Sequence, residues 1–323
     1  MPRMPRESRP TRDETSDADL RSVLRNAILK LERERVPSAP LAAELLLMHA
    51  LGHDRVWIYA HSEHRLDVAD YKKYFTLIEQ RSGGVPTQHL TGHQEFWGLE
   101  FEVTPDVLIP RPETEHLIEV ALERLGINMG ETSERRRSPY QIADVGTGSG
   151  CIAVALAREL PEARIVATDI SQAALKVASR NAEHLGVASQ IQFTECNLLD
   201  AFDPRVRISN RQVGREAPAG FDLIVSNPPY IGRWEAVTLP REVREHEPEA
   251  ALFGGEKGTE LYKPLIAQAG RLLRPGGSLA IELGHTSSEH VSQLLETAEW
   301  ADAVFTKDLA GIQRVVSARR TSK

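Results

Sequence analysis

The residues best suited to chemistry are Asn227-Pro228-Pro229-Tyr230, which directly follow an apolar segment at 221–226. The two prolines stiffen the backbone in an extended conformation and have no N–H group, so their carbonyl oxygens remain available as acceptors. The side chain of Asn227 offers a further carbonyl acceptor beside them. Together these groups can hold a planar –NH₂ group by both hydrogens, with Tyr230 against its flat face.

This geometry suits the transfer of a methyl group to a conjugated nitrogen. Such a nitrogen is a poor nucleophile because its lone pair is delocalised. Hydrogen-bond acceptors on both N–H bonds return electron density to the nitrogen and aim its lone pair at the methyl group. A proton can leave the nitrogen after the attack. Orientation alone can lower a barrier by about 7–11 kcal/mol in favourable cases. The methyl donor would be a sulfonium; a Pro-Pro pair that merely ends a strand is the alternative interpretation.

A glycine-rich loop joins an apolar strand predicted at 141–145 to a helix predicted at 151–159. Glycine permits positive φ and lets backbone N–H groups approach a ligand closely. The spacing is Gly-x-Gly-x-Gly, which differs from the dinucleotide pattern Gly-x-Gly-x-x-Gly and lacks the lysine of a P-loop. The candidate residues for binding a cofactor are Gly146, Thr147, Gly148, Ser149 and Gly150.

Two acids accompany the loop. Asp169 ends the next predicted strand, where a carboxylate can accept hydrogen bonds from both hydroxyls of a ribose. Loop and acid together predict a cofactor that carries adenosine; NAD, or a tight turn with Asp169 as a helix cap before Ser171, are the alternatives. Asp144 precedes the loop and is expected to orient the loop amides, to reach an ammonium group of the cofactor, or simply to cap the turn.

The elements that must position these residues alternate between strand and helix from about residue 141. Such alternation predicts an α/β fold with a mostly parallel, doubly wound sheet. Strands are predicted at 141–145, 164–169, 190–195, 221–226, 278–283, 304–308 and 311–318, and helices at 151–159, 171–185, 259–273 and 286–297.

The first part of the chain has a different pattern. Apolar residues at helical spacing predict helices at 20–31, 41–51 and 67–81, with Ser16 or Asp17 capping the first, which together form a small bundle. Alternating residues around Trp97-Gly98 predict a hairpin that links the domains. The expected domains are a disordered tail (1–16), a helical substrate-recognition domain (17–88), a linker hairpin (89–112) and a catalytic domain (113–323).

Composition excludes several classes of protein. Hydrophobic residues make up 41% and charged residues 26% of the 323 residues, which is ordinary for a globular protein. The formal net charge of −7 argues against a protein that coats nucleic acid, although Arg-containing loops at 128–139 and 203–220 leave a local patch as an alternative to plain solvated loops. The two cysteines have no partner at metal-ligand spacing and fit a reducing compartment. We expect a cytoplasmic monomer without a metal or a membrane span.

Taken together, the glycine loop, Asp169 and the Asn-Pro-Pro-Tyr motif resemble class I S-adenosylmethionine-dependent methyltransferases that act on amino groups. The segment 109–115 (IPRPETE) looks like the signature of the bacterial peptide chain release factor glutamine methyltransferases, as do 94–98 (QEFWG), Glu247-Pro248 and 251–255 (ALFGG). The resemblance covers roughly residues 20–319. It implies a seven-stranded class I methyltransferase sheet with an N-terminal helical bundle and a hairpin linker.

The resemblance also implies a reaction. Family members transfer a methyl group from S-adenosyl-L-methionine to the side-chain amide nitrogen of glutamine in the Gly-Gly-Gln motif of release factors. By similarity, the glycine loop holds the methionine moiety and Asp169 the ribose. Asn227 and the Pro228 carbonyl bind the glutamine amide, with Asn227 also near the cofactor, and Pro229 and Tyr230 shape the slot. Asn197 stands where many members carry an aromatic residue near adenine, so it is expected to hydrogen-bond that base.

Other interpretations remain open at this point. The same motif serves methyltransferases of exocyclic amines in nucleic acids, and a methyltransferase of a ribosomal-protein glutamine would look similar in the catalytic half. A binding module without activity is a third alternative. Within IPRPETE, the charged residues either cap a helix and pair with acids, or line the pocket for cofactor and glutamine; these are Arg111, Glu113 and Glu115.

Overall fold

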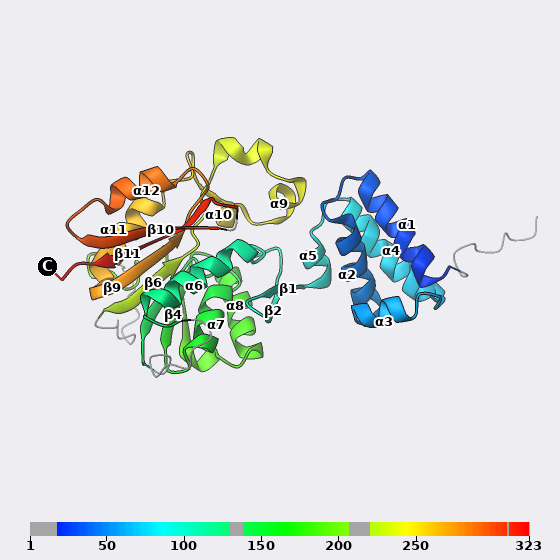
Figure 1. Cartoon of the computed structure of the whole chain (residues 1–323), viewed down its shortest axis with the longest axis horizontal. Coiled ribbons are helices and arrows are strands. Elements are labelled where there is room, and N and C mark those ends of the chain that lie inside the picture. The colour runs from blue at the N-terminus through cyan, green and yellow to red at the C-terminus, as the bar shows by residue number, and fades with distance from the viewer. Residues whose placement is uncertain (1–17, 129–137, 207–219, 309, 323) are drawn as a thin grey trace, which may run out of the picture. The chain divides into compact units, whose positions relative to one another are not determined.

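The computed structural model describes residues 18–128, 138–206, 220–308 and 310–322. The tail expected at 1–16 and most of the two Arg-containing loops lie outside the described residues. The chain divides into two compact units, one ending at Thr91 and the other beginning at Gly92. Figure 1 colours the first unit blue to cyan and the second from cyan to red.

The N-terminal unit is a bundle of helices. Its first helix begins at Leu20, and the Asp19 carboxylate accepts a hydrogen bond from the Ser22 amide at 2.8 Å. The expectation that Ser16 or Asp17 caps this helix is therefore wrong, because a capping side chain reaches only the amides two or three residues beyond it. The helices predicted at 41–51 and 67–81 are present. The elements are α1 (Leu20–Arg33), α2 (Ala39–Leu51), α3 (Arg55–Ala60), α4 (Val68–Ser82) and α5 (Thr87–Thr91).

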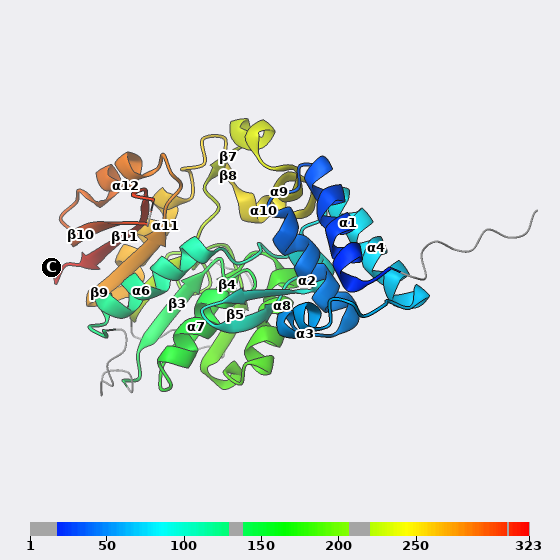
Figure 2. The same cartoon turned by 45° about the vertical axis from the view of Figure 1, so that its right-hand side comes forward.

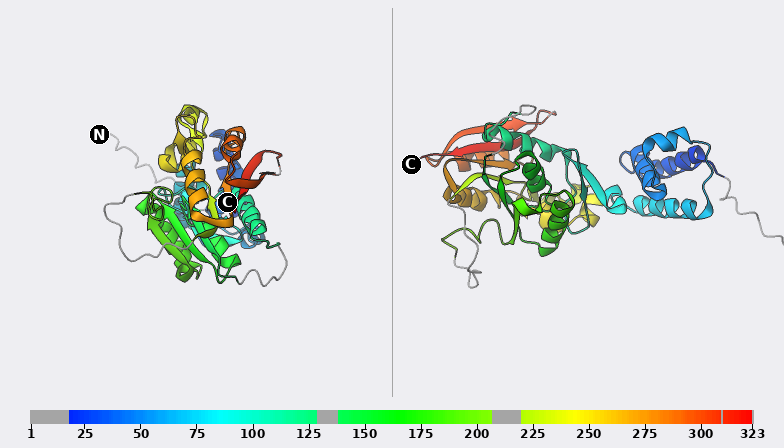
Figure 3. Two further views of the ribbon diagram at one scale, coloured as in Figure 1. Left: turned by 90° about the vertical axis from the view of Figure 1, so that its left-hand side faces the viewer. Right: turned by 90° about the horizontal axis from the view of Figure 1, so that it is seen from below.

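The C-terminal unit contains a seven-stranded sheet in the order β10-β11-β9-β6-β3-β4-β5. Six strands point in the same direction, and β11 alone among these seven is antiparallel to both of its neighbours, at the end of the sheet coloured orange to red in Figure 3. The doubly wound α/β sheet predicted from the sequence is thus confirmed. Its strands are β3 (Gln141–Val145), β4 (Arg164–Asp169), β5 (Ile191–Glu195), β6 (Phe221–Ser226), β9 (Leu273–Glu282), β10 (Trp300–Lys307) and β11 (Gln313–Arg320).

Helices cover both faces of this sheet, because successive side chains of a buried strand point to opposite sides. Ile142 of β3 and Ile165 of β4 share a core with α6 and α7. Ala143 and Val166, the next residues along the same strands, share a second core with α11 and α12 (Figure 2). The helices of this unit that pack on the sheet are α6 (Glu115–Arg124), α7 (Cys151–Glu159), α8 (Gln172–His184), α11 (Tyr262–Leu272) and α12 (Ser288–Leu295).

The predicted hairpin is also confirmed: β1 (His93–Phe96) pairs antiparallel with β2 (Leu99–Glu102). Its turn residues Trp97 and Gly98 have φ values of 56° and 68°, the positive values that the favoured two-residue hairpin turn requires. Asn181 of α8 attaches the hairpin to the rest of the C-terminal unit. Its side chain accepts from the Glu102 amide at 2.8 Å and donates to the carbonyls of Glu102 at 3.0 Å and Ser149 at 2.8 Å.

Short elements escape the sequence patterns, because periodicity needs several residues to become visible. The segment between 231 and 255 holds five of them: β7 (Ile231–Gly232), the 3-10 helix η4 (Arg233–Thr238), α9 (Arg241–His246), α10 (Glu249–Leu252) and β8 (Phe253–Gly255). Strand β9 begins at Leu273 rather than at the predicted residue 278, because Pro275-Gly276-Gly277 looks like a turn in the sequence but continues the strand. None of the helices among the described residues has the length and hydrophobicity that crossing a bilayer requires.

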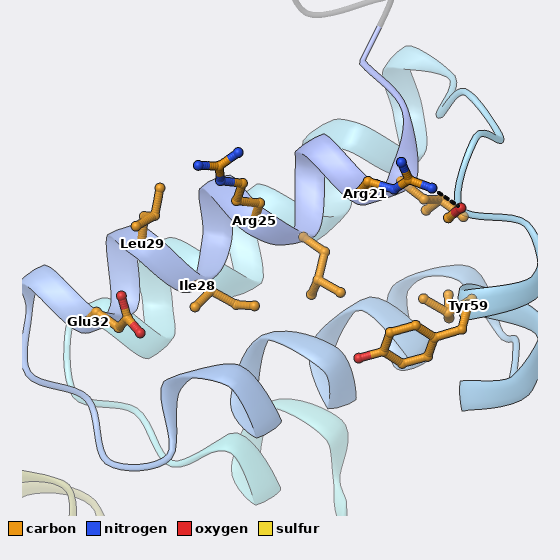
Figure 4. A pocket seen from close by; sticks show the side chains of 10 residues that line it. Arg21, Arg25, Ile28, Leu29, Glu32 and Tyr59 are labelled. Atoms are coloured by element: carbon orange, nitrogen blue, oxygen red, sulfur yellow. Dashed lines mark hydrogen bonds between the residues drawn. The ribbon is translucent and has the colours of Figure 1, made fainter.

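A groove of about 500 Å³ lies between α1 and α3 of the N-terminal unit (Figure 4). Ile28, Leu29 and Tyr59 contribute apolar surface to it, while Arg21 donates to the Ser62 hydroxyl at 3.0 Å. The motifs that predict chemistry all belong to the C-terminal unit. The groove is therefore a surface feature of the bundle and not part of the candidate catalytic machinery.

We predict that Asn181→Ala lowers the free energy of unfolding by about 2–4 kcal/mol, because it leaves the buried Ser149 carbonyl and both backbone groups of Glu102 without their partner. The neighbouring Arg180 also contacts Glu102, but through an exposed ion pair. Arg180→Ala is the matched control and is expected to cost at most about 1 kcal/mol. Urea unfolding measures both variants; equal losses would contradict this account of how the hairpin is attached.

Candidate active site

The three glycines of the loop after β3 have positive φ, with values of 75°, 55° and 83° for Gly146, Gly148 and Gly150. A Cβ atom on Gly146 or Gly148 would meet nothing within 4 Å, whereas one on Gly150 would lie 2.9 Å from the Ala178 Cβ. The first two glycines therefore keep space open above the loop. The third allows the start of α7 to pack closely on α8.

Asp144 fixes the glycine loop and the start of α7 through hydrogen bonds to its carboxylate. Its side chain is fully buried, and Oδ2 accepts from the Thr147 hydroxyl at 2.6 Å and from the Ala153 amide at 3.2 Å. Burial raises the pKa of Asp144 to about 7, and the hydrogen bond from Thr147 partly opposes that shift. These contacts correspond to the first of the expected roles for Asp144, the orientation of the loop.

Asp169 is fixed at the end of β4. Its two oxygens accept from the Gly148 amide at 2.9 Å and from the Ser171 amide at 2.8 Å. Burial raises its pKa, while the backbone amides act in the opposite direction. Each carboxylate oxygen has a second lone pair, so the group can still accept hydrogen bonds from a ligand.

These residues surround a cavity of about 290 Å³ at the carboxyl edge of the parallel strands, where ligands of open α/β sheets bind. The sequence-predicted residues that line it are Gly146, Gly148, Asp169, Asn197, Asn227, Pro228 and Pro229. Thr147 and Ser149 are buried, and Gly150 packs on Ala178, so these three are not among the described residues that line the cavity. Ile170, which sequence analysis missed, lines it with 65% of its surface exposed.

A second cavity, of about 190 Å³, adjoins the first at the Asn-Pro-Pro-Tyr motif. Asn227, Pro228 and Pro229 line both cavities, and Tyr230 lines the second. Much of the remaining wall is apolar, formed by Leu108, Ile231, Leu239, Val243, Ala251 and Leu252. The motif thus contributes to the walls of both cavities, which are largely apolar, and the glycine loop and Asp169 line only the larger one.

Glycines bring a second backbone segment against the motif. A Cβ on Gly254 would lie 2.2 Å from the Pro229 carbonyl oxygen, and one on Gly258 would lie 2.3 Å from that of Tyr230. Only glycine permits this approach, which is completed by the pairing of β7 with β8. The packing gives the ALFGG stretch at 251–255 a structural reason.

Sequence analysis missed two buried polar residues behind the motif. Thr114, within IPRPETE, accepts a hydrogen bond from Asn227 Nδ2 at 3.1 Å. Glu282, at the end of β9, accepts from the Tyr230 hydroxyl at 3.3 Å and is 1% exposed. Burial raises the pKa of Glu282 to about 7. A single acid in the apolar run Ser278–Leu283 was the available signal for Glu282, whereas an uncharged threonine between two acids gives little.

The charged residues of IPRPETE divide between the two expected roles. Arg111 lines the second cavity and also pairs with the buried Glu247, which in addition accepts from the Ile109 amide at 3.2 Å. Glu115 begins α6 and accepts from the Trp97 amide at 2.8 Å. Arg111 thus both pairs with an acid and faces the pocket, and Glu115 is structural.

The comparisons with known proteins agree with this geometry. The model of the PrmC N-terminal domain matches residues 22–92, and that of a methyltransferase domain matches residues 137–315. The chain is 41% identical over 301 residues to the release factor glutamine methyltransferase of Koribacter versatilis, covering 93% of this chain and 98% of that protein. The chain belongs to the release factor glutamine methyltransferase family. A relative of the same name from Nitratidesulfovibrio vulgaris is 38% identical, covering 95% of this chain and 97% of its own.

The resemblance drawn from the motifs is therefore confirmed for the family as a whole. Among solved structures, the hMettl16 catalytic domain in complex with MAT2A 3′UTR hairpin 6 aligns with a TM-score of 0.52 at 17% identity, covering 73% of this chain and 80% of that one. Identity this low shows the fold alone. The structural alignment confirms the class I methyltransferase sheet and gives no information about the substrate.

We predict that alanine substitutions at two glycines of the loop have different main effects, one on stability and the other on ligand binding. Gly150→Ala places a Cβ against Ala178 and is expected to lower the free energy of unfolding by about 2–4 kcal/mol, from left-handed strain plus overpacking. Gly148→Ala bears only the strain, about 1–2 kcal/mol. The methyl group of the new alanine would project into the larger cavity. Gly148→Ala should therefore mainly weaken the binding of S-adenosylhomocysteine.

Urea unfolding and calorimetric titration with S-adenosylhomocysteine measure the two effects separately. Equal stability of the two variants, or wild-type affinity in Gly148→Ala, would contradict the different roles assigned to these glycines.

Proposed function

We propose that this chain transfers a methyl group from S-adenosyl-L-methionine to the side-chain amide nitrogen of the glutamine in the Gly-Gly-Gln motif of peptide chain release factors. One observation carries the proposal beyond family membership: two cavities share Asn227, Pro228 and Pro229 in their walls, and only the larger one also contains the glycine loop and Asp169. A methyl transfer needs adjoining sites of this kind, because the donor and the acceptor must be held with their reacting atoms close together and aligned.

The larger cavity fits the donor. The open space above Gly146 and Gly148 leaves room for the methionine part of the donor, and Asp169 keeps lone pairs for ribose hydroxyls. Ile170 and Leu198 offer apolar surface to a purine, and Asn197 a polar side chain. When bound there, S-adenosyl-L-methionine supplies an activated methyl group on a positively charged sulfur.

The smaller cavity fits a glutamine side chain. Its apolar wall accommodates the methylene groups and excludes water, while the Asn227 side-chain oxygen and the Pro228 carbonyl accept the two amide hydrogens. These acceptors hold the nitrogen still and raise its electron density. The proton leaves the nitrogen after methylation, so the site needs no strong base. Pro229 and Tyr230 complete the slot.

The remaining assignments follow from the substrate. A release factor is a protein, so the helical unit is proposed to recognise its body, within domains bounded at about 17–88, 89–112 and 113–323. Release factors act in translation, and the two free cysteines fit a reducing compartment. We therefore assign the chain to the cytoplasm, as a monomer that needs no direct contact with nucleic acid.

The test is incubation of the chain with S-adenosyl-L-methionine labelled in the methyl group and a release factor. Label is expected on the glutamine of Gly-Gly-Gln and absent when that glutamine is replaced by alanine. Label found only on a ribosomal protein, or only on RNA or DNA, would refute the proposal in favour of those substrates.

Asn227→Ala is expected to lower kcat by about 10²–10³-fold, the usual effect of removing one preorganised group that stabilises a transition state. Affinity for S-adenosylhomocysteine should fall much less, since Asn227 is one of many residues around the larger cavity. Unchanged turnover would show that Asn227 does not hold the amide.

A further inference from the structure

The direction of the Asn227 carboxamide decides whether it can serve its proposed role. The substrate amide needs an acceptor, so the oxygen and not the nitrogen of Asn227 must face it. The two ends of a carboxamide have nearly the same shape, and their hydrogen-bond partners therefore decide which end points where. In the structure, Nδ2 donates to the Thr114 hydroxyl at 3.1 Å, which turns Oδ1 away from Thr114.

Thr114 can accept this hydrogen bond only if its own hydrogen points elsewhere. It is 2% exposed, so solvent does not compete. Its hydroxyl lies near the buried carboxyl of Glu282 and lowers the pKa of that acid, and the Oε2 atom of Glu282 has no other hydrogen-bond partner among the described residues. An ionised carboxylate only accepts, so it takes the single hydroxyl hydrogen and leaves the lone pairs of Thr114 for Asn227.

The fold places these groups together. Ser226 of β6 stands opposite Ile281 of β9, so Asn227 and Glu282 follow side by side at the same edge of the sheet. The turn before α6 brings Thr114 over both. Glu282 also accepts from the Tyr230 hydroxyl, so one acid contacts the last residue of the motif directly and the first through Thr114.

We propose that Thr114, oriented by Glu282, is a positioning residue that turns the Asn227 oxygen toward the substrate amide; this rests on the proposed function. The chain of contacts runs in one direction from carboxylate to hydroxyl to carboxamide. If the direction of either hydrogen bond is reversed, the Asn227 side chain turns its Nδ2 group toward the substrate. The N–H groups of Asn227 and of the substrate amide then face each other, and the amide is not held.

The state of Glu282 sets the direction. Burial raises its pKa, and Glu113 acts in the same sense, while Arg314 and the hydroxyls of Thr114 and Tyr230 lower it. When protonated, Glu282 can donate to Thr114, which then donates to Asn227 and reverses the carboxamide. The methylation rate should therefore rise with pH as Glu282 ionises.

The experiment compares wild type with Thr114→Val, which keeps the shape and removes the hydroxyl, and Thr114→Ser, which keeps the hydroxyl. Thr114→Val is expected to lower kcat by about 10–100-fold, as loss of an orienting outer group does at metal sites, with unchanged affinity for S-adenosylhomocysteine and a chain that remains folded although somewhat less stable. Thr114→Ser should restore most of the rate. The rise of kcat with pH should be present in wild type and absent in Thr114→Val.

Each result decides one claim. Wild-type kcat and pH profile in Thr114→Val would overturn the positioning role, and so would a Thr114→Val loss that Thr114→Ser does not restore while both variants remain folded. Absence of release factor methylation by the wild type would instead overturn the proposed function, before any variant is compared.

Discussion

The wall that Asn227, Pro228 and Pro229 form between two cavities is the constraint on which the rest of the structure depends. It stands at the carboxyl end of β6, between β9 and β3. Strand β3 supplies the glycine loop, and β9 supplies Glu282. Because parallel strands end at one edge of the sheet, residues far apart in the chain meet there without any long excursion of the backbone.

This edge also concentrates buried acids. Asp144 and Glu282 are fully buried, and burial raises the pKa of each to about 7. Such groups weaken a core unless they are hydrogen-bonded, and clusters of them are typical of functional sites. Here each acid accepts a hydrogen bond from a hydroxyl group. Asp144 accepts from Thr147 in the glycine loop, and Glu282 accepts from Tyr230 of the motif. The acids thus hold one residue of the glycine loop and one residue of the motif in place.

The sequence predicts the parts of this arrangement that have a regular hydrophobic pattern or that contain glycines and other turn residues. Alternation of strand and helix indicates the sheet, glycines mark the loop, and Trp97-Gly98 marks the hairpin turn. Contacts between distant segments leave no such trace. The hydrogen bond from Asn227 to Thr114 joins residues separated by 113 positions, and the packing of Gly254 on Pro229 depends on the short strand pair β7 and β8. Only the folded chain shows that an uncharged threonine stands behind the motif.

The most direct measurement is a crystal structure of this chain with S-adenosylhomocysteine and a peptide containing Gly-Gly-Gln. We expect the sulfur in the cavity bounded by Gly146 and Asp169, the glutamine side chain in the slot bounded by Leu108 and Tyr230, and the amide nitrogen at the Asn227 oxygen between them. A sulfur located away from this wall, or a glutamine bound on the same side as the donor, would contradict the account.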